Sequence, residues 1–189
     1  MRICQPVPPP RKFIPPEKAV AQLCPTCALC CNGVLFKDVE LQPVDNPPRL
    51  RSLGLPVANA KNRKSQIVNR KFPQPCAALD GCRCRIYDDR PARCRQFECA
   101  LLKSVQAGEI ELARALRVIL NTRQRADQVH ALLWELGNED KALALSLRFK
   151  RTKQRFEASP PDDARAEVFS RLTLAVHDLN LWLRGRFYP

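Results

Sequence analysis

Residues 24–31 read CPTCALCC, and residues 76–99 read CAALDGCRCRIYDDRPARCRQFEC. These two stretches decide the fold, because they hold nine of the ten cysteines of the 189-residue chain. A single free cysteine often behaves as a small buried hydrophobe, but nine thiols this close together favour metal ligation. The candidate metal ligands are Cys24, Cys27, Cys30, Cys31, Cys76, Cys82, Cys84, Cys94 and Cys99. The tenth, Cys4, stands alone beside prolines, and we expect it to take no part in a site.

The geometry of the first stretch depends on its backbone. A helix turns by about 100° per residue, so its four cysteines would share one face there, with Pro25 tolerated at the first helical position. In an extended strand, Cys30 and Cys31 would point to opposite sides and serve different ions or partners. We expect the helix, followed directly by a turn at Asn32-Gly33.

The cellular compartment decides whether clustered cysteines are expected to bind metal or to form disulfides. The N-terminus runs from Met1 straight into prolines and lacks the apolar core of about 7–15 residues that a secretory signal needs. No stretch approaches the ~20 apolar residues of a membrane span. We therefore expect a cytoplasmic protein without membrane contact, in which thiols stay reduced and metal is the reason to cluster them.

The chain carries a net charge of +13, and most of the excess lies with the cysteines. Residues 1–103 hold 18 Lys and Arg against 8 Asp and Glu, whereas residues 104–189 hold 14 against 11. Basic side chains beside thiols favour the deprotonated, metal-binding form, so we expect lowered thiol pKa values in the second stretch. Two basic segments, residues 49–71 and 148–155, offer contacts to an acidic protein or nucleic-acid partner. The interleaved arginines are Arg83, Arg85, Arg90, Arg93 and Arg95.

The chain as a whole is predicted to be mostly α. We divide it into a proline-rich arm (1–19), a small cysteine-cluster metal-binding domain with short helices and a hairpin (20–103), and a bundle of about four helices (104–189). Apolar periodicity and capping residues predict helices over 109–121, 126–136, 138–156 and 163–184, and short strands over 34–36 and 65–69.

Two motifs resemble a known family. The opening Cys24-x-x-Cys27-x-x-Cys30-Cys31 is followed by Cys84-x-Ile86-Tyr87-x-x-Arg90-Pro91-x-x-Cys94-Arg95-x-Phe97. Together they resemble the bacterial YkgJ-like cysteine-cluster (CxxCxxCC) family, which has a zinc- or iron-chelating domain, over about residues 20–103. The resemblance implies that the ligands include Cys24, Cys27, Cys30, Cys31, Cys76, Cys84 and Cys94. Cys82 and Cys99 rest on spacing alone.

One residue departs from the family pattern. The family has Gly after the second cysteine of the opening motif, whereas this chain has Ala28. A positive φ would strain an alanine, so this residue favours the helical interpretation of the first stretch. Around the site, we expect Tyr87 and Phe97 to pack against the metal and exclude water. His130 and His177 lack partners at ligand spacing and are assigned structural or solvated roles.

The leading function is metal binding by clustered thiolates, with zinc or an iron–sulfur cluster as the cofactor. Zinc would close its tetrahedron with four thiolates, and a [4Fe–4S] cluster would also take four and permit redox chemistry. One alternative is a cluster-dependent protein-modifying enzyme, since relatives of the family include proteins described as flagellin lysine methylases. No glycine-rich nucleotide loop supports it. The other alternative is a basic zinc protein that binds nucleic acid.

Overall fold

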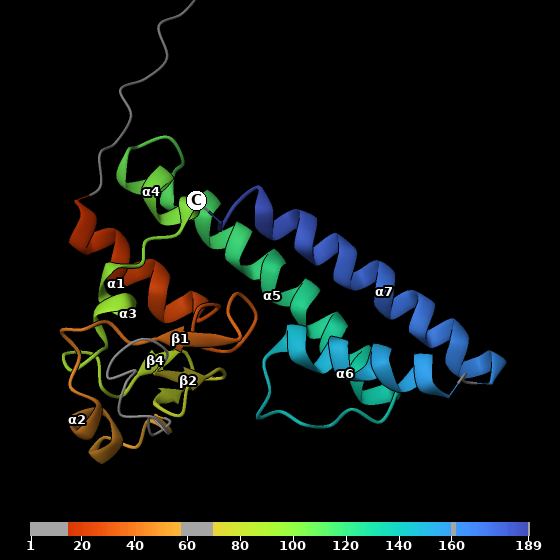
Figure 1. The fold of residues 1–189 in the computed structure, drawn as a ribbon. Helices are drawn as coiled ribbons and strands as arrows, with labels where there is room; N and C mark the ends of the chain where they lie inside the picture. The colour runs from red at the N-terminus through yellow and green to blue at the C-terminus, as the bar shows by residue number, and fades with distance from the viewer. Residues whose placement is uncertain (1–14, 58–69, 160–161, 189) are drawn as a thin grey trace, which may run out of the picture.

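The computed structural model describes residues 15–57, 70–159 and 162–188, and it is mostly α, as predicted. Figure 1 shows short helices and strands on one side of the molecule and long helices running away from them on the other. The strand predicted over 65–69 lies outside the described residues. Of the predicted arm only its last residues are described, and from Pro16 onward they are helical.

The cysteine-rich half folds from short elements. In chain order they are α1 (Pro16–Cys27), β1 (Asp38–Glu40), α2 (Pro47–Ser52), β2 (Lys71–Pro73), β3 (Leu79–Asp80), β4 (Arg83–Cys84), α3 (Ala92–Gln96) and α4 (Ala100–Gln106). β1 pairs antiparallel with β2, and β3 with β4, the second pair being a hairpin of the predicted kind. The strand predicted over 34–36 is wrong. A hydrogen bond from Leu35 N to Leu29 O (3.1 Å) closes a turn there, and the first strand starts only at Asp38.

Three helices form the C-terminal bundle, namely α5 (Leu112–Glu135), α6 (Leu145–Ala158) and α7 (Asp163–Arg184). α7 has the predicted bounds, because Asp162 caps it by accepting a hydrogen bond from Arg165 N (2.9 Å) and Gly185 follows its last turn. The two helices predicted over 109–121 and 126–136 are the single helix α5, since residues 122–125 hold no Pro or Gly to interrupt it. The bundle therefore has three helices where about four were expected.

A buried polar cluster explains why α6 begins later than predicted. Asn138 does not cap a helix; its side chain donates to Arg148 O (3.0 Å) and Thr152 Oγ1 (2.9 Å), and accepts from Arg148 Nε (3.2 Å). Because of these hydrogen bonds to α6, residues 138–144 form a non-helical loop between α5 and α6. Arg148 also contacts His130 Nδ1 (2.6 Å), which gives that histidine the structural role predicted for it.

The described residues form two hydrophobic cores. The larger core crosses between the halves, taking Leu23 and Leu29 from the cysteine-rich half and Ile119, Leu133 and Phe187 from the bundle. The smaller core lies within the cysteine-rich half alone. Its buried members are Val39, Leu41, Leu50, Leu55, Val57, Phe72 and Ala78. The bundle is thus stabilised partly by residues on the cysteine side of the chain.

Hydrogen bonds fasten the halves where these elements meet. They run from Leu145 N to Gly33 O (3.0 Å), from Ala100 N to Phe187 O (3.2 Å) and from Tyr188 Oη to Leu35 O (3.2 Å). Gly33 has a φ of +83°, and a Cβ there would stand 2.9 Å from the Ala144 Cα. Glycine is therefore required at this contact, because a side chain would push the two halves apart.

Candidate metal centre

The first cysteine stretch is half helix and half turn. α1 ends at Cys27, and Ala28 follows with a φ of 53°, its N–H donating to Cys24 O (3.2 Å). The Ala28 carbonyl then accepts from Cys31 N (2.8 Å) and Asn32 N (2.9 Å). The predicted helix through Cys31, and the expectation that Ala28 avoids positive φ, are therefore wrong. The hydrogen bonds of this turn offset the cost of a left-handed alanine, which is about 1–2 kcal/mol.

This turn separates the two adjacent cysteines. Cys30 packs against the larger core, whereas the carbonyl of Cys31 accepts a hydrogen bond from Cys76 N (2.7 Å), at the start of the second stretch. The four sulfurs of the opening motif consequently do not share one helical face. Cys30 and Cys31 thus have different surroundings, as they would in an extended strand, but the backbone here is a turn.

Four cysteines, here named set A, gather beside α1. Cys24 and Cys27 lie on α1, Cys30 lies in the turn, and Cys99 is the N-cap residue of α4. Burial raises the pKa of Cys27 to about 12, and the nearby charges of Cys99 and Cys24 add to the rise. Burial and then the charge of Cys27 raise the pKa of Cys30 well above its usual value, and burial and then Cys99 raise that of Cys24. These mutual effects place the four thiols close together.

Four other cysteines, named set B, gather around the β3–β4 hairpin. They are Cys31 after the turn, Cys76 before β3, Cys84 on β4 and Cys94 on α3. Burial raises the pKa of Cys31 to about 12, followed by the charges of Cys76, Cys94 and Cys84. Burial, then Cys76 and Cys84, do the same at Cys94. Each set therefore draws on both stretches of the sequence.

The hydrophobic cores separate five of the eight cysteines in the same way. Cys27, Cys30 and Cys99 belong to or pack against the larger core. Cys76 and Cys94 pack against the smaller one. At each thiol the largest cysteine charge comes from its own set, which supports a division into two groups of four, although Cys31 also raises the pKa of Cys30 and Cys24 that of Cys31. The groups adjoin, since Cys30 and Cys31 are consecutive residues.

Cys82 lies outside both sets. It sits in the turn between β3 and β4, where its Sγ accepts a hydrogen bond from Arg123 Nη1 (3.3 Å) on α5. Its charge is not among the causes of the raised pKa values of the set A and set B thiols. Of the nine candidate ligands, the structure therefore gathers eight and sets Cys82 apart.

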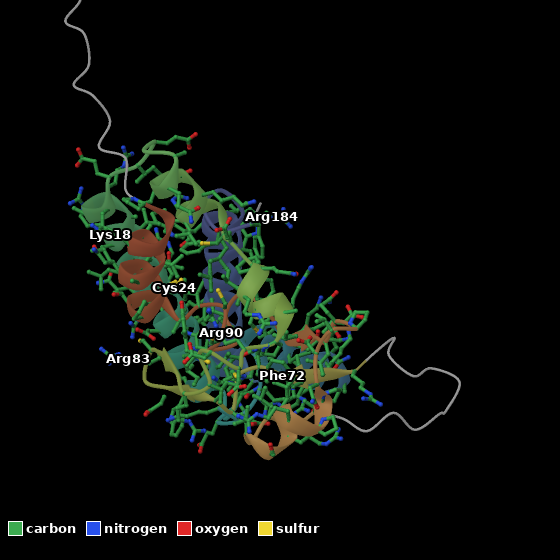
Figure 2. The ribbon with its side chains drawn as sticks, turned by 90° about the vertical axis from the view of Figure 1, so that its left-hand side faces the viewer. Lys18, Cys24, Phe72, Arg83, Arg90 and Arg184 are labelled. Carbon is green, nitrogen blue, oxygen red and sulfur yellow. The ribbon has the colours of Figure 1, made fainter. Side chains whose placement is uncertain are left out.

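The interleaved arginines do not lower the thiol pKa values as predicted. Seven of the nine clustered cysteines have raised pKa values, because removal from water outweighs neighbouring positive charge. Arg90 opposes the rise at both Cys24 and Cys94, which places its guanidinium near both sets. Figure 2 shows Arg90 below Cys24, toward the part of the molecule that contains Phe72.

The two aromatic residues expected at the site differ from one another. Tyr87 is 45% exposed and lies under the guanidinium of Arg90, 3.5 Å from its ring centroid, so it does not shield a metal from water. Phe97 is partly buried and meets Phe36 edge to face, with ring centroids 5.0 Å apart. Phe36 itself packs against the larger core. Phe97 therefore lines the set A side of the module.

A residue that the sequence reasoning missed positions α3. The Asp45 carboxylate accepts hydrogen bonds from Gln42 N (2.7 Å) and from Ala92 N (2.7 Å), the first residue of α3. It thereby fixes the helix that carries Cys94. The neighbouring Asn46 was readable as a helix cap before Pro47, but nothing in the sequence pairs residue 45 with residue 92.

The chemistry of the donors suits a thiophilic metal. All nine cysteines of the two stretches are free thiols. Among residues 15–57, 70–159 and 162–188, no three Cys, His, Asp or Glu side chains are already aimed at one point in metal-binding geometry. A cysteine has a single side-chain torsion, so rotation about it re-aims the sulfur without moving the backbone. Groups of four thiolates match the ligand number and softness that zinc and iron–sulfur clusters require.

A comparison with protein families agrees with this chemistry. The family model CxxCxxCC, "Putative zinc- or iron-chelating domain", matches residues 23–122, more than half of the chain. The chain belongs to the CxxCxxCC family. The match includes all nine clustered cysteines and ends within α5. No curated protein and no solved structure matches the chain. In the described residues, every helix is too short or too polar to cross a membrane.

Proposed function

We propose that this CxxCxxCC protein binds two metal centres, each held by four thiolates. Site A would be formed by Cys24, Cys27, Cys30 and Cys99, and site B by Cys31, Cys76, Cys84 and Cys94. The observation that carries the proposal is the division of eight cysteines into two neighbouring groups by their mutual charge effects, with Cys27, Cys30 and Cys99 at the larger hydrophobic core and Cys76 and Cys94 at the smaller. Cys82 takes no part as a ligand.

The raised thiol pKa values describe the metal-free state. Buried thiols with pKa values near 12 are protonated and neutral at neutral pH, as at Cys27 and Cys94. Metal binding displaces these protons and stabilises the thiolates. Two thiophilic ions or clusters therefore account for so many buried and closely spaced thiols better than core packing does.

We favour iron–sulfur clusters over zinc as the occupants. A four-thiolate cluster is anionic, and Arg90 near both sets supplies positive charge that would stabilise it. The cluster would supply electron transfer or redox sensing, while the protein holds it and limits its contact with water. Zinc in the same thiolates would give closed structural sites with no open position for chemistry.

Elemental analysis and absorption spectra of protein purified without oxygen test the proposal. We expect two centres per chain, brown in colour if iron–sulfur and colourless if zinc. Cys27→Ser and Cys94→Ser should each remove one centre, whereas Cys82→Ser, the matched control, should retain both. Wild-type protein with neither zinc nor iron, and with all its thiols free, would contradict metal binding. Loss of a centre in Cys82→Ser would contradict the assignment of ligands.

A further inference from the structure

One arginine of the helical bundle reaches into the cysteine module. Arg123 lies on α5, and its Nη1 donates to Thr26 O (2.9 Å) in the last turn of α1. The same nitrogen donates to Cys82 Sγ (3.3 Å) in the β3–β4 turn. A single guanidinium thus joins three segments that are far apart in the sequence. It does so beside Cys27, the residue that follows Thr26.

The position of Arg123 has two physical effects. Its hydrogen bond to Thr26 O (2.9 Å) brings its positive charge to the residue before Cys27, a member of set A. Its hydrogen bond also engages the Cys82 sulfur, which would otherwise be a fifth thiol next to the end of α1. The Nη1 of an arginine carries two N–H groups, so this one nitrogen can donate to a carbonyl and to a sulfur at once.

We infer that Arg123 is the positioning residue of site A: it places a fixed positive charge beside the four thiolates and holds Cys82 out of the ligand set. The inference rests on the proposed function. Four thiolates around Zn²⁺ leave a net charge of −2, and a neighbouring cation stabilises such a site by Coulomb attraction. The bundle therefore contributes to a metal site whose ligands all come from the other half of the chain.

The rate of metal release to an excess of a colorimetric chelator tests the inference. Cys27→Ser and Cys94→Ser first identify which phase of release belongs to site A and which to site B. Arg123→Gln should then accelerate the site A phase by about tenfold, the lower range for loss of a residue that supports metal ligands. The site B phase should stay unchanged. Arg114→Gln, at another exposed position of α5, is the matched control and should change neither phase.

Two further variants separate positioning from general stability. Arg123→Lys keeps the charge and loses the fork, so it should restore most of the slow site A release. Cys82→Ser should release metal as the wild type does, because Cys82 is held outside the site. The inference is overturned if Arg123→Gln behaves like Arg114→Gln, or if it accelerates both phases equally without rescue by lysine. Retention of all metal in both Cys27→Ser and Cys94→Ser would instead overturn the proposed function itself.

Discussion

The two cysteine sets lie in unlike surroundings. Three cysteines of set A pack against a core that α1 shares with the long helices, whereas two of set B pack against a core of seven buried residues from the short elements and loops of the cysteine-rich half. A small core supplies little folding free energy, so the region around site B must depend more on its metal. The difference teaches that, if both proposed sites hold metal, similar ligands would serve two purposes: site A would join the two halves of the molecule, and site B would stabilise one small region.

Complete metal removal should have the largest effect, and an unequal one. Structural zinc supplies about 10–16 kcal/mol in small domains, which is a large share of the stability of a region with a small core. We expect the amides of β1, β2 and α3 to lose hydrogen-exchange protection, while α5 and α7 keep most of theirs. α1 should be intermediate, because Leu23 stays packed in the larger core. Equal protection of all these elements after chelation would show that neither site is structural.

The pH dependence of metal affinity tests whether both sites are four-thiolate sites. Burial raises the pKa of Cys27 in set A, and of Cys31 and Cys94 in set B, to about 12. Metal binding near neutral pH must therefore release about four protons per site, so affinity falls steeply as the pH is lowered. Chelator competition at several pH values should give equal slopes for the two sites. A slope near two at either one would mean that fewer thiols bind there.

Shortening one side chain in each core sharpens the contrast. Phe72 is fully buried in the smaller core and Leu133 in the larger. Phe72→Ala should cost about 3–5 kcal/mol and Leu133→Ala about 2–5 kcal/mol. Thermal unfolding of the metal-loaded protein measures both. Only Phe72→Ala should also speed metal release from site B; the same acceleration from Leu133→Ala would mean that the cores are not independent.

The smallest expected effect concerns the bundle alone. Burial, and then the charge of Arg148, lower the pKa of His130, while Asp127 opposes this and Lys141 assists. A lowered pKa means that the unfolded chain binds the proton more readily. The contribution of His130 to stability is therefore present above its unfolded pKa of about 6.5 and is lost as the pH falls below it.

Thermal unfolding at pH 7.5 and pH 5.5 measures the effect. His130→Gln should lower the melting temperature at pH 7.5 and reduce the further loss at pH 5.5. His177→Gln, at an exposed position of α7, is the control and should follow the wild type. An unchanged pH dependence in His130→Gln would assign the wild-type loss to other groups.

Local patterns predicted α7 and the candidate ligands, because caps and clustered thiols act over short distances along the chain. Asp162 and Gly185 delimit α7 as the sequence indicated. The division of the cysteines was beyond such patterns. It depends on a left-handed turn at Ala28, which an alanine disfavours and which was therefore not predicted. It also depends on the approach of Cys99 to α1 through the larger core.

The error at residues 138–144 has a similar origin. Asn138 has the local chemistry of a helix cap, but its partners Arg148 and Thr152 lie further along the chain. Competition between a local and a tertiary hydrogen bond cannot be judged without knowing that α6 packs back on this segment. The thiol pKa values were predicted wrongly for a similar reason. Neighbouring arginines in the sequence suggested lowered pKa values, but burial of the thiols has the larger effect and raises them.

The contacts of Phe187 and Tyr188 with the cysteine-rich half set an order for biosynthesis. Every residue of set B has been translated once Cys94 is made, so its small core can close around a metal early. The larger core also needs Phe187, which is fully buried and accepts a hydrogen bond from Ala100 N. At about 5–20 residues per second, the ribosome takes several seconds to travel from Cys99 to that residue. During this interval the thiols of set A lack the cover of Phe187, so if set A holds the proposed metal, its site would be completed after that of set B.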